Sequence, residues 1–259
     1  RWLRRCCRQL GIDIVHTHLL HDHWLAAGSL KNFCSLGFGP KPLLIRTVHT
    51  SAPLRTDWLH RKLWLQYSDK IVCVSRSAAR RAEEALALPK GAIESIGGGV
   101  DLGRFLPGLD GAALREELKI PPDAPVAGIV ARMRAGRGFR WLMRAMPLVL
   151  EKLPEARLIA VGRGELKKWF KHELTYPEYK GRVIYAGYRG RDLPAAYAAM
   201  DVSLFLGLGS EGSCRAILEA MASGKPTIGL NRGAVPEIIS DGNTGFLVKH
   251  RDVKDLAEK

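Results

Sequence analysis

Short apolar runs alternate with longer mixed stretches along the whole chain, and this alternation predicts parallel α/β structure. The runs that we interpret as strands are 12–16, 43–48, 71–74 and 93–96 in the first part of the chain, and 126–130, 156–161, 183–186, 202–205 and 226–230 in the second. Helices are expected between them, including 112–118, 139–150 and one that begins near Ser213. The strands fall into two groups, which indicates two domains.

The segment between the two groups has the composition of a connection. It contains several prolines, a Gly-Leu-Asp-Gly turn and the short helix expected at 112–118. We therefore predict a partial first domain at 1–106, a linker at 107–124 and a second domain at 125–259. With 259 residues, 46% of them apolar, the chain is long enough to form two modest cores.

The net charge and the cysteine content indicate which kind of partner and which compartment suit the protein. The net charge is +14, which favours an anionic partner, and the five cysteines form no C-x-x-C pair, which is typical of a reducing compartment. No apolar run approaches the roughly 18 residues that span a bilayer. We expect a cytoplasmic protein that is soluble or peripheral at the inner membrane face.

Basic residues mix with tryptophan and leucine in four segments, 1–5, 61–64, 140–144 and 167–171. Such a mixture suits an anionic membrane surface, but it also suits solvated helix faces that each bury one aromatic residue. No recognised nucleic-acid motif accompanies the charge, so a nucleic-acid partner is the weaker alternative.

Two glutamates eight residues apart are the most informative polar feature. Glu211 follows a strand and a glycine-rich bend, and Glu219 lies about two turns inside the next helix. Free N–H groups at a helix start attract anions such as a phosphate. Carboxylates on either side of that point accept hydrogen bonds from hydroxyl groups. The pattern predicts a nucleotide-sugar site, with Glu211 at the sugar and Glu219 at the ribose.

The segment 211–248 resembles the donor-binding core of the retaining GT-B glycosyltransferases of family four. The shared pattern is E-x7-E, Gly224-Lys-Pro226, Pro236-Glu237 and the run Asp241-Gly-Asn-Thr-Gly-Phe-Leu-Val248. The resemblance implies two Rossmann-like domains facing across a cleft. It also implies transfer of a sugar from a UDP- or GDP-type donor to a hydroxyl of a lipid, polysaccharide or small molecule, with retention and without a metal or other cofactor.

The same resemblance makes the first domain incomplete. The segment Asp13-Ile-Val-His-Thr-His18 is similar to the family's fourth strand, and the sequence stops before the family's final helices. We therefore expect either a chain truncated at both ends or a complementary segment from a partner that completes the first sheet. One alternative function is therefore a non-catalytic nucleotide-sugar-binding module. A second alternative is a nucleotide-sugar 2-epimerase of the same fold.

Fixed cations are expected to stabilise the departing diphosphate. Arg132 and Arg137 match the spacing of the family's two phosphate-binding cations, although the family usually has lysine at the second position. The resemblance places the helix start at Gly212, Ser213 and Cys214 against the same diphosphate.

The remaining site residues follow from the resemblance alone. Gly187 and Tyr188 lie where the family holds the nucleobase, and His49 lies where it has a catalytic histidine close to the donor sugar. Together with Arg132, Arg137 and Glu211, His49 makes up the expected catalytic set.

Two residues are expected on the acceptor side, His18 and Ser75. Ser75 is equally consistent with an N-cap for the helix that follows it. Histidines at 16, 18, 21 and 23 resemble metal ligands, but the family carries a similar His-x-His without a metal, so we expect none here.

Overall fold

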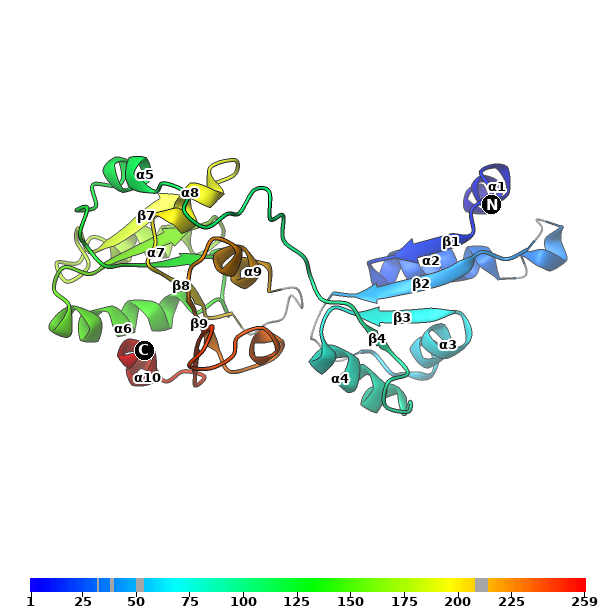
Figure 1. Cartoon of the computed structure of the whole chain (residues 1–259). Helices are drawn as coiled ribbons and strands as arrows, with labels where there is room; N and C mark the ends of the chain where they lie inside the picture. Colours follow the sequence, from blue (N-terminus) through cyan, green and yellow to red (C-terminus); the bar gives the residue numbers. More distant parts are fainter. Residues whose placement is uncertain (32, 38–39, 50–53, 208–213) are drawn as a thin grey trace. The chain divides into compact units, whose positions relative to one another are not determined.

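The protein forms two compact units with parallel β-sheets (Figure 1). The structure is a computed structural model, and it describes residues 1–31, 33–37, 40–49, 54–207 and 214–259. The first unit is Arg1–Gly98, and the second comprises the described residues from Gly99 onward.

The first unit contains a four-stranded sheet in the order β1-β2-β3-β4. The strands are β1 (Ile14–Thr17), β2 (Leu43–Val48), β3 (Lys70–Cys73) and β4 (Glu94–Ser95). The helices are α1 (Trp2–Gln9), α2 (Leu20–Leu30), α3 (Trp58–Gln66) and α4 (Arg76–Leu86), with a short η1 (Cys34–Leu36).

Helices bury one face of this sheet. Leu44 and Val48 are four residues apart on β2, so they point to the same face. Leu44 belongs to a core with residues of α1, α2 and α3, and Val48 to a core with residues of α3 and α4. Leu43 on the opposite face of β2 is 52% exposed, and Ile14, its partner in β1, is 51% exposed.

The second unit contains a six-stranded sheet in the order β10-β9-β8-β5-β6-β7, all parallel. The strands are β5 (Val126–Val130), β6 (Arg157–Val161), β7 (Val183–Gly187), β8 (Val202–Phe205), β9 (Thr227–Leu230) and β10 (Gly245–Val248). The helices are α5 (Ala112–Glu117), α6 (Phe139–Lys152), α7 (Lys167–Glu173), α8 (Leu193–Ala198), α9 (Arg215–Ala222) and α10 (Val253–Glu258), with a short η2 (Val235–Glu237). This is the doubly wound strand order of a dinucleotide-binding fold.

Helices bury both faces of the second sheet. Leu158 and Ile159 are neighbours in β6, so they point to opposite faces, and both are fully buried. Leu158 packs in a core with residues of α6, α7 and α10, and Ile159 in a core with residues of α5, α8 and α9. The predicted α/β class with parallel sheets is therefore confirmed.

The segment predicted as a linker packs against the second sheet. Leu114 of α5 lies in the same core as Tyr197 of α8. The Arg115 guanidinium reaches the Asp201 carboxylate at 3.1 Å, and that carboxylate accepts a hydrogen bond from the Val126 N–H at 2.7 Å. The domain boundaries at 106 and 125 stay a prediction, whereas the contacts divide the chain between Gly98 and Gly99.

All five cysteines are free thiols. None of the helices in the described part of the chain is long and apolar enough to cross a bilayer.

Candidate functional site

The carboxyl ends of β5 and β8 form the centre of the candidate site. These strands are neighbours at the point where the strand order of the second sheet reverses, and open parallel sheets bind ligands there. The predicted site residues Glu211, Gly212 and Ser213 lie outside the described residues, and their roles stay predictions. The described site is built from the loops after β5, β6, β7 and β8.

The loops after β5 and β6 run side by side in very close contact. The Met133 N–H donates a hydrogen bond to the Arg163 carbonyl at 2.9 Å. A Cβ at Gly162 would lie 1.9 Å from the Ala131 carbonyl oxygen, and a Cβ at Gly164 would lie 2.4 Å from the Met133 carbonyl oxygen. Both glycines also have positive φ. Only glycine allows this approach, so these two positions shape the floor of the site.

A hollow of about 710 Å³ opens above these loops. Arg132, predicted for the phosphates, and Tyr188, predicted for the nucleobase, both line it. The Arg163 guanidinium lies 4.4 Å from the centroid of the Tyr188 ring, a cation–π contact. Gly187 ends β7 with a φ of 79°, which turns the chain toward Tyr188. The structure thus brings Arg132 and Tyr188 to one hollow, whereas Arg137 is not among its described lining residues.

Arg137 occupies a different environment from Arg132. Arg132 is exposed, whereas Arg137 is only 6% exposed. A Cβ at Gly207 would lie 3.2 Å from Nη1 of Arg137, so the guanidinium lies against the bend that follows β8. Gly138 has a φ of 84°, and a Cβ there would lie 2.2 Å from the Leu206 Cβ. The start of α6 is therefore packed directly on the end of β8.

Helix α9 begins at the position that the sequence predicted for anion binding. Cys214 is its N-cap, with a φ of 40° and 2% exposure. The left-handed backbone of a non-glycine residue is uncommon and is often found at functional turns. The N–H groups of the first turn of α9 are a general anion-binding feature.

Glu219 is a buried carboxylate that a hydrogen bond holds in one orientation. It is 8% exposed and accepts a hydrogen bond from the Tyr197 hydroxyl at 3.0 Å. Burial raises the pKa of the Glu219 carboxyl, while the Tyr197 hydroxyl and the charges of Arg215 and Arg104 act to lower it. The Tyr197 hydrogen bond orients one carboxylate oxygen, so the group has a defined direction for a ligand hydroxyl.

Sequence reasoning missed Tyr197 and Arg104. Tyr197 lies in a short helix of small residues, 22 positions from Glu219, and no local pattern marks it. The Arg104 guanidinium donates to the Gly190 carbonyl, two residues after Tyr188, and acts on Glu219 through its charge. Arg104 therefore connects the surroundings of Glu219 with those of Tyr188.

In the first unit, the predicted residues His18 and His49 are hydrogen-bonded to each other. They follow β1 and β2, and His18 Nδ1 lies 2.8 Å from His49 Nε2. One of these two nitrogens carries a hydrogen and donates the bond, and the other nitrogen accepts it. Burial lowers the pKa of His49, and the neighbouring His18, Arg46 and His16 lower it further. The protonated form of the His49 imidazole is therefore disfavoured.

Arg46 is an unexpected buried charge beside these histidines. It lies in β2, is 6% exposed, and its Nε and Nη1 atoms have no hydrogen-bond partner within the described part of the chain. Burial lowers the pKa of the Arg46 guanidinium, which Asp22 partly opposes. A positive charge in this position disfavours protonation of the histidines near it.

His16 and His23 are held by hydroxyl groups, whereas His21 Nδ1 lies 3.8 Å from an Asp22 carboxylate oxygen. His16 Nε2 lies 2.7 Å from Thr47 Oγ1. His23 is fully buried, with Nδ1 2.8 Å from Thr17 Oγ1 and Nε2 2.7 Å from Ser68 Oγ. In the described ranges, no group of three or more His, Cys, Asp or Glu side chains is placed to hold a metal ion.

Ser75 serves as the N-cap of α4. Its hydroxyl accepts a hydrogen bond from the Ala78 N–H at 3.2 Å, and the residue is buried. This is the structural role that the sequence left open, and a role on the acceptor side stays a prediction.

Comparison with family models gives two matches that together cover nearly the whole chain. Residues 124–259 match the model described as "Glycosyl transferases group 1". Residues 1–104 match the model described as "Glycosyltransferase Family 4". The two matches correspond to the second and first sheets, respectively.

Two curated relatives illustrate the range of similarity. A GDP-mannose-dependent alpha-(1-6)-phosphatidylinositol monomannoside mannosyltransferase of Mycolicibacterium smegmatis is 31% identical over 193 residues, which cover 72% of this chain and 50% of that protein. A D-inositol 3-phosphate glycosyltransferase of Catenulispora acidiphila is 27% identical over 262 residues, which cover 92% of this chain and 60% of that protein. The chain thus spans about half to three fifths of the length of these relatives.

A solved structure of similar fold is that of HepE from Anabaena in complex with UDP-glucose. It aligns with a TM-score of 0.81 at 20% identity, over 99% of this chain and 70% of that one. A sucrose-phosphate synthase from Thermosynechococcus elongatus aligns with a TM-score of 0.74, also at 20% identity, over 99% of this chain and 65% of that one. The predicted GT-B fold class is confirmed by these alignments. On the match of more than half its length, the chain belongs to the glycosyl transferases group 1 family.

Proposed function

We propose that this chain binds a nucleoside-diphosphate sugar in its second unit and belongs to an enzyme that moves the sugar to an acceptor hydroxyl. The observation that carries the proposal is the 710 Å³ hollow lined by both Arg132 and Tyr188, at the carboxyl ends of β5, β6 and β7. A cation for phosphates and an aromatic residue for a base, brought together at the carboxyl-terminal edge of a parallel sheet, suit a nucleotide.

The proposed donor is a UDP- or GDP-sugar. One relative is named as GDP-mannose-dependent, and the HepE structure is described as a complex with UDP-glucose. Glu219 is proposed to accept hydrogen bonds from the ribose hydroxyls, and Glu211 from those of the sugar. The Tyr197 hydroxyl leaves Glu219 further acceptor capacity, since an ionised carboxylate has about four lone-pair sites.

The proposed reaction proceeds with retention and without a metal ion. Its main requirement is to stabilise the negative charge that develops on the departing diphosphate. Arg132 and Arg137 supply fixed positive charge, and the first turn of α9 after Cys214 supplies backbone N–H groups. The leaving phosphate itself is proposed to take the proton of the acceptor hydroxyl, so the reaction needs no carboxylate pair of the glycosidase type.

His49 is proposed to assist from the first unit as a neutral hydrogen-bonding group. Burial lowers the pKa of His49, and the neighbouring His18, Arg46 and His16 lower it further, which favours an uncharged imidazole. A neutral imidazole donates and accepts hydrogen bonds to sugar hydroxyls without adding to the positive charge of the diphosphate site. His18 is proposed to line the acceptor side.

We also propose that the protein works at the cytoplasmic face of an anionic membrane. On α7 and its neighbours, Arg140 lies over the Trp169 ring at 4.8 Å, and Lys167 and Lys171 lie within 5.8 Å of the Tyr185 ring centroid. Basic and aromatic side chains in one area suit anionic lipid headgroups. Sedimentation with vesicles of phosphatidylglycerol, but not phosphatidylcholine, is the expected result, and equal sedimentation with both would contradict the proposal.

The role of Glu219 gives the direct test of the proposed function. A thermal-shift screen against a panel of nucleotide sugars identifies the donor, and calorimetry then compares Glu219→Ala with the wild-type chain. We expect at least a tenfold loss of affinity, because the ribose hydroxyls lose a charged acceptor. Glu178→Ala, an exposed glutamate on the same unit, is the matched control. Equal affinities for both variants would refute the assignment.

A further inference from the structure

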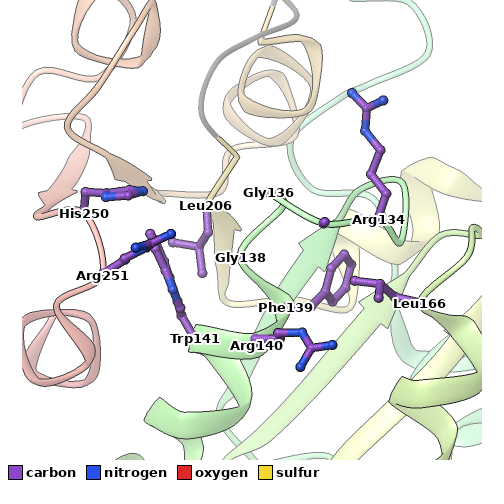
Figure 2. A pocket seen from close by; sticks show the side chains of 11 residues that line it. Arg134, Gly136, Gly138, Phe139, Arg140, Trp141, Leu166, Leu206, His250 and Arg251 are labelled. Atoms are coloured by element: carbon purple, nitrogen blue, oxygen red, sulfur yellow. The ribbon is translucent and has the colours of Figure 1, made fainter.

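A second hollow of about 210 Å³ lies in the same unit and shares no described lining residue with the 710 Å³ hollow (Figure 2). It is bordered by the start of α6, by Leu206 at the end of β8, and by the segment that follows β10. Because the strands of the sheet are parallel, all three borders belong to its carboxyl-terminal edge. The second hollow therefore opens at the same edge as the candidate donor site, and the proposed donor binding does not use it.

The lining of the second hollow is strongly basic. Three arginines line it, Arg134, Arg140 and Arg251, and none of its described lining residues is acidic. His250 also lines it, and burial together with the charges of Arg232 and Arg251 lowers the pKa of its imidazole. Arg140 and Arg251 have no carboxylate within salt-bridge distance among the described residues. The charges of Arg140 and Arg251 therefore raise the local concentration of anions.

Three side chains shape one wall of this hollow. Figure 2 shows His250, Arg251 and Trp141 grouped beside Leu206, while Arg134 and Arg140 extend away from that group at its margin. The Trp141 and His250 rings make an edge-on contact with centroids 4.8 Å apart. The apolar surface of the Trp141 ring therefore lies beside the side chains of His250 and Arg251.

We propose that the second hollow binds a phosphoryl group distinct from the diphosphate of the donor, namely a phosphate monoester or diester carried by the acceptor. Guanidinium groups match phosphate oxygens in geometry and charge. The Trp141 ring offers a surface for the carbon atoms next to the phosphate. A volume of about 210 Å³ lies below the range of roughly 300–1,000 Å³ typical of whole drug-sized ligands, so it suits one group of a larger acceptor.

Binding of a phosphoryl group and its role in the acceptor are tested separately. Binding of a phosphoryl group in the second hollow does not depend on the proposed function. The assignment of the second hollow to a phosphate of the acceptor rests on the proposed transfer reaction. The experiment therefore measures anion binding and donor binding independently.

Indole N–H signals give a readout at the site itself. The chain has six tryptophans, and the Trp141 signal is assigned by its loss in Trp141→Phe. The ¹⁵N-labelled chain is titrated with inorganic phosphate, with the donor site saturated by nucleoside diphosphate. If no nucleoside diphosphate binds, the titration is made in Arg132→Ala instead. We expect a saturable shift of the Trp141 signal that is larger than the shifts of the other indoles.

Two variants test whether Arg251 and Arg140 bind the phosphoryl group in the second hollow. Arg251 has a φ of 64°, so Arg251→Gly removes the guanidinium and suits the backbone. We expect at least a fivefold weaker phosphate affinity in Arg251→Gly and a smaller loss in Arg140→Gln. Arg191→Ala, an exposed arginine of the same unit, is the matched control and should not change the affinity. An unshifted Trp141 signal, or equal affinity in Arg251→Gly and the control, would overturn the proposal.

The source of the phosphoryl group is distinguished in a second arm. Glycerol 1-phosphate represents a soluble acceptor, and vesicles of phosphatidylglycerol represent a lipid acceptor, with phosphatidylcholine vesicles as reference. A shift of the Trp141 signal by glycerol 1-phosphate that Arg251→Gly weakens supports a soluble phosphomonoester. A response to phosphatidylglycerol alone, weakened by the same variant, supports a lipid phosphodiester. No response to either contradicts the acceptor role, whereas normal donor binding by Arg251→Gly shows that the donor site is intact.

Discussion

The carboxyl-terminal edges of the two sheets carry different chemistry. In the first unit this edge presents His18 and His49, bonded to each other at 2.8 Å, and burial together with the neighbouring His18, Arg46 and His16 lowers the pKa of His49. In the second unit it presents arginines, the N-cap of α9 and two glycines at close backbone contacts. Both are edges where parallel sheets bind ligands. This difference supports the proposal that the second unit stabilises negative charge and that His49 of the first unit acts as a neutral hydrogen-bonding group.

The two sheets also differ in how they are buried. Leu158 and Ile159 of β6 are both fully buried, on opposite faces. Leu43 and Ile14 of the first sheet are each about half exposed, at 52% and 51%. Since the stabilisation by burial grows with the apolar area removed from water, the second unit is expected to be the more stable one.

The largest expected effect tests the close backbone contacts of the second unit. Gly162→Ala would place a Cβ 1.9 Å from the Ala131 carbonyl oxygen, at a φ of 149°. We expect the free energy of unfolding of this unit to fall by about 4 kcal/mol or more in urea titrations. Gly181→Ala is the matched control, because Gly181 has a φ of 72° but open space around it, and should cost only about 1 kcal/mol. Similar losses in both variants would argue against the role of the contact.

The next effect is the response of the first unit to acid. Burial lowers the pKa of His23 to about 4, with a further contribution from the charge of Arg46. The unfolded chain therefore binds more protons than the folded one below pH 6.5, so stability falls as the pH drops from about 6.5 to about 4. The loss approaches about 3 kcal/mol.

Amide hydrogen exchange at pH 7 and pH 4.5, read separately for the two units, checks this effect. We expect protection to decrease more in the first unit, and His23→Gln to reduce that pH dependence. A second unit that loses protection first would contradict the comparison.

A smaller effect distinguishes the arginines of the second unit. Arg132→Ala removes a cation that lines the donor hollow, and we expect about a thirtyfold weaker affinity for the nucleotide sugar, since a hydrogen bond to a charged group contributes about 1.5–3 kcal/mol. Arg191→Ala in the same unit should leave the affinity unchanged. Calorimetry measures both, and an unchanged affinity in Arg132→Ala would remove this arginine from the site.

The smallest effect concerns the histidine pair of the first unit. His18 is one of the groups that lower the pKa of His49, so His18→Asn should raise that pKa toward its ordinary value. NMR titration of the His49 ring in both chains measures the change. Donor binding by the second unit should stay as in the wild type. A lower pKa in the variant would show that His18 does not act in this way.

Strands with clear apolar runs could be predicted to the residue. The predictions 43–48, 126–130 and 202–205 coincide with β2, β5 and β8. The edge strand β4 is shorter than the predicted 93–96, since only Glu94 and Ser95 pair with β3. Helix α6 continues two residues beyond the predicted end at 150, with Pro147 inside it.

The site could be predicted only where its residues lie in a local pattern. Arg132 was predicted because Arg132 and Arg137 match the spacing of the family's two phosphate-binding cations. The pairs His18–His49 and Tyr197–Glu219 are 31 and 22 positions apart, and their contacts depend on how loops and helices pack. Arg251 gave no sequence signal, because its place at the second hollow depends on the packing of the segment after β10 against α6.

A calorimetric titration of the chain with UDP and GDP, once in EDTA and once in magnesium chloride, tests the central proposal most directly. If arginines and the start of α9 take the place of a metal ion, one nucleoside diphosphate binds with one-to-one stoichiometry and similar affinity in both buffers. Binding that requires magnesium, or binding of neither nucleotide in either buffer, would contradict the account.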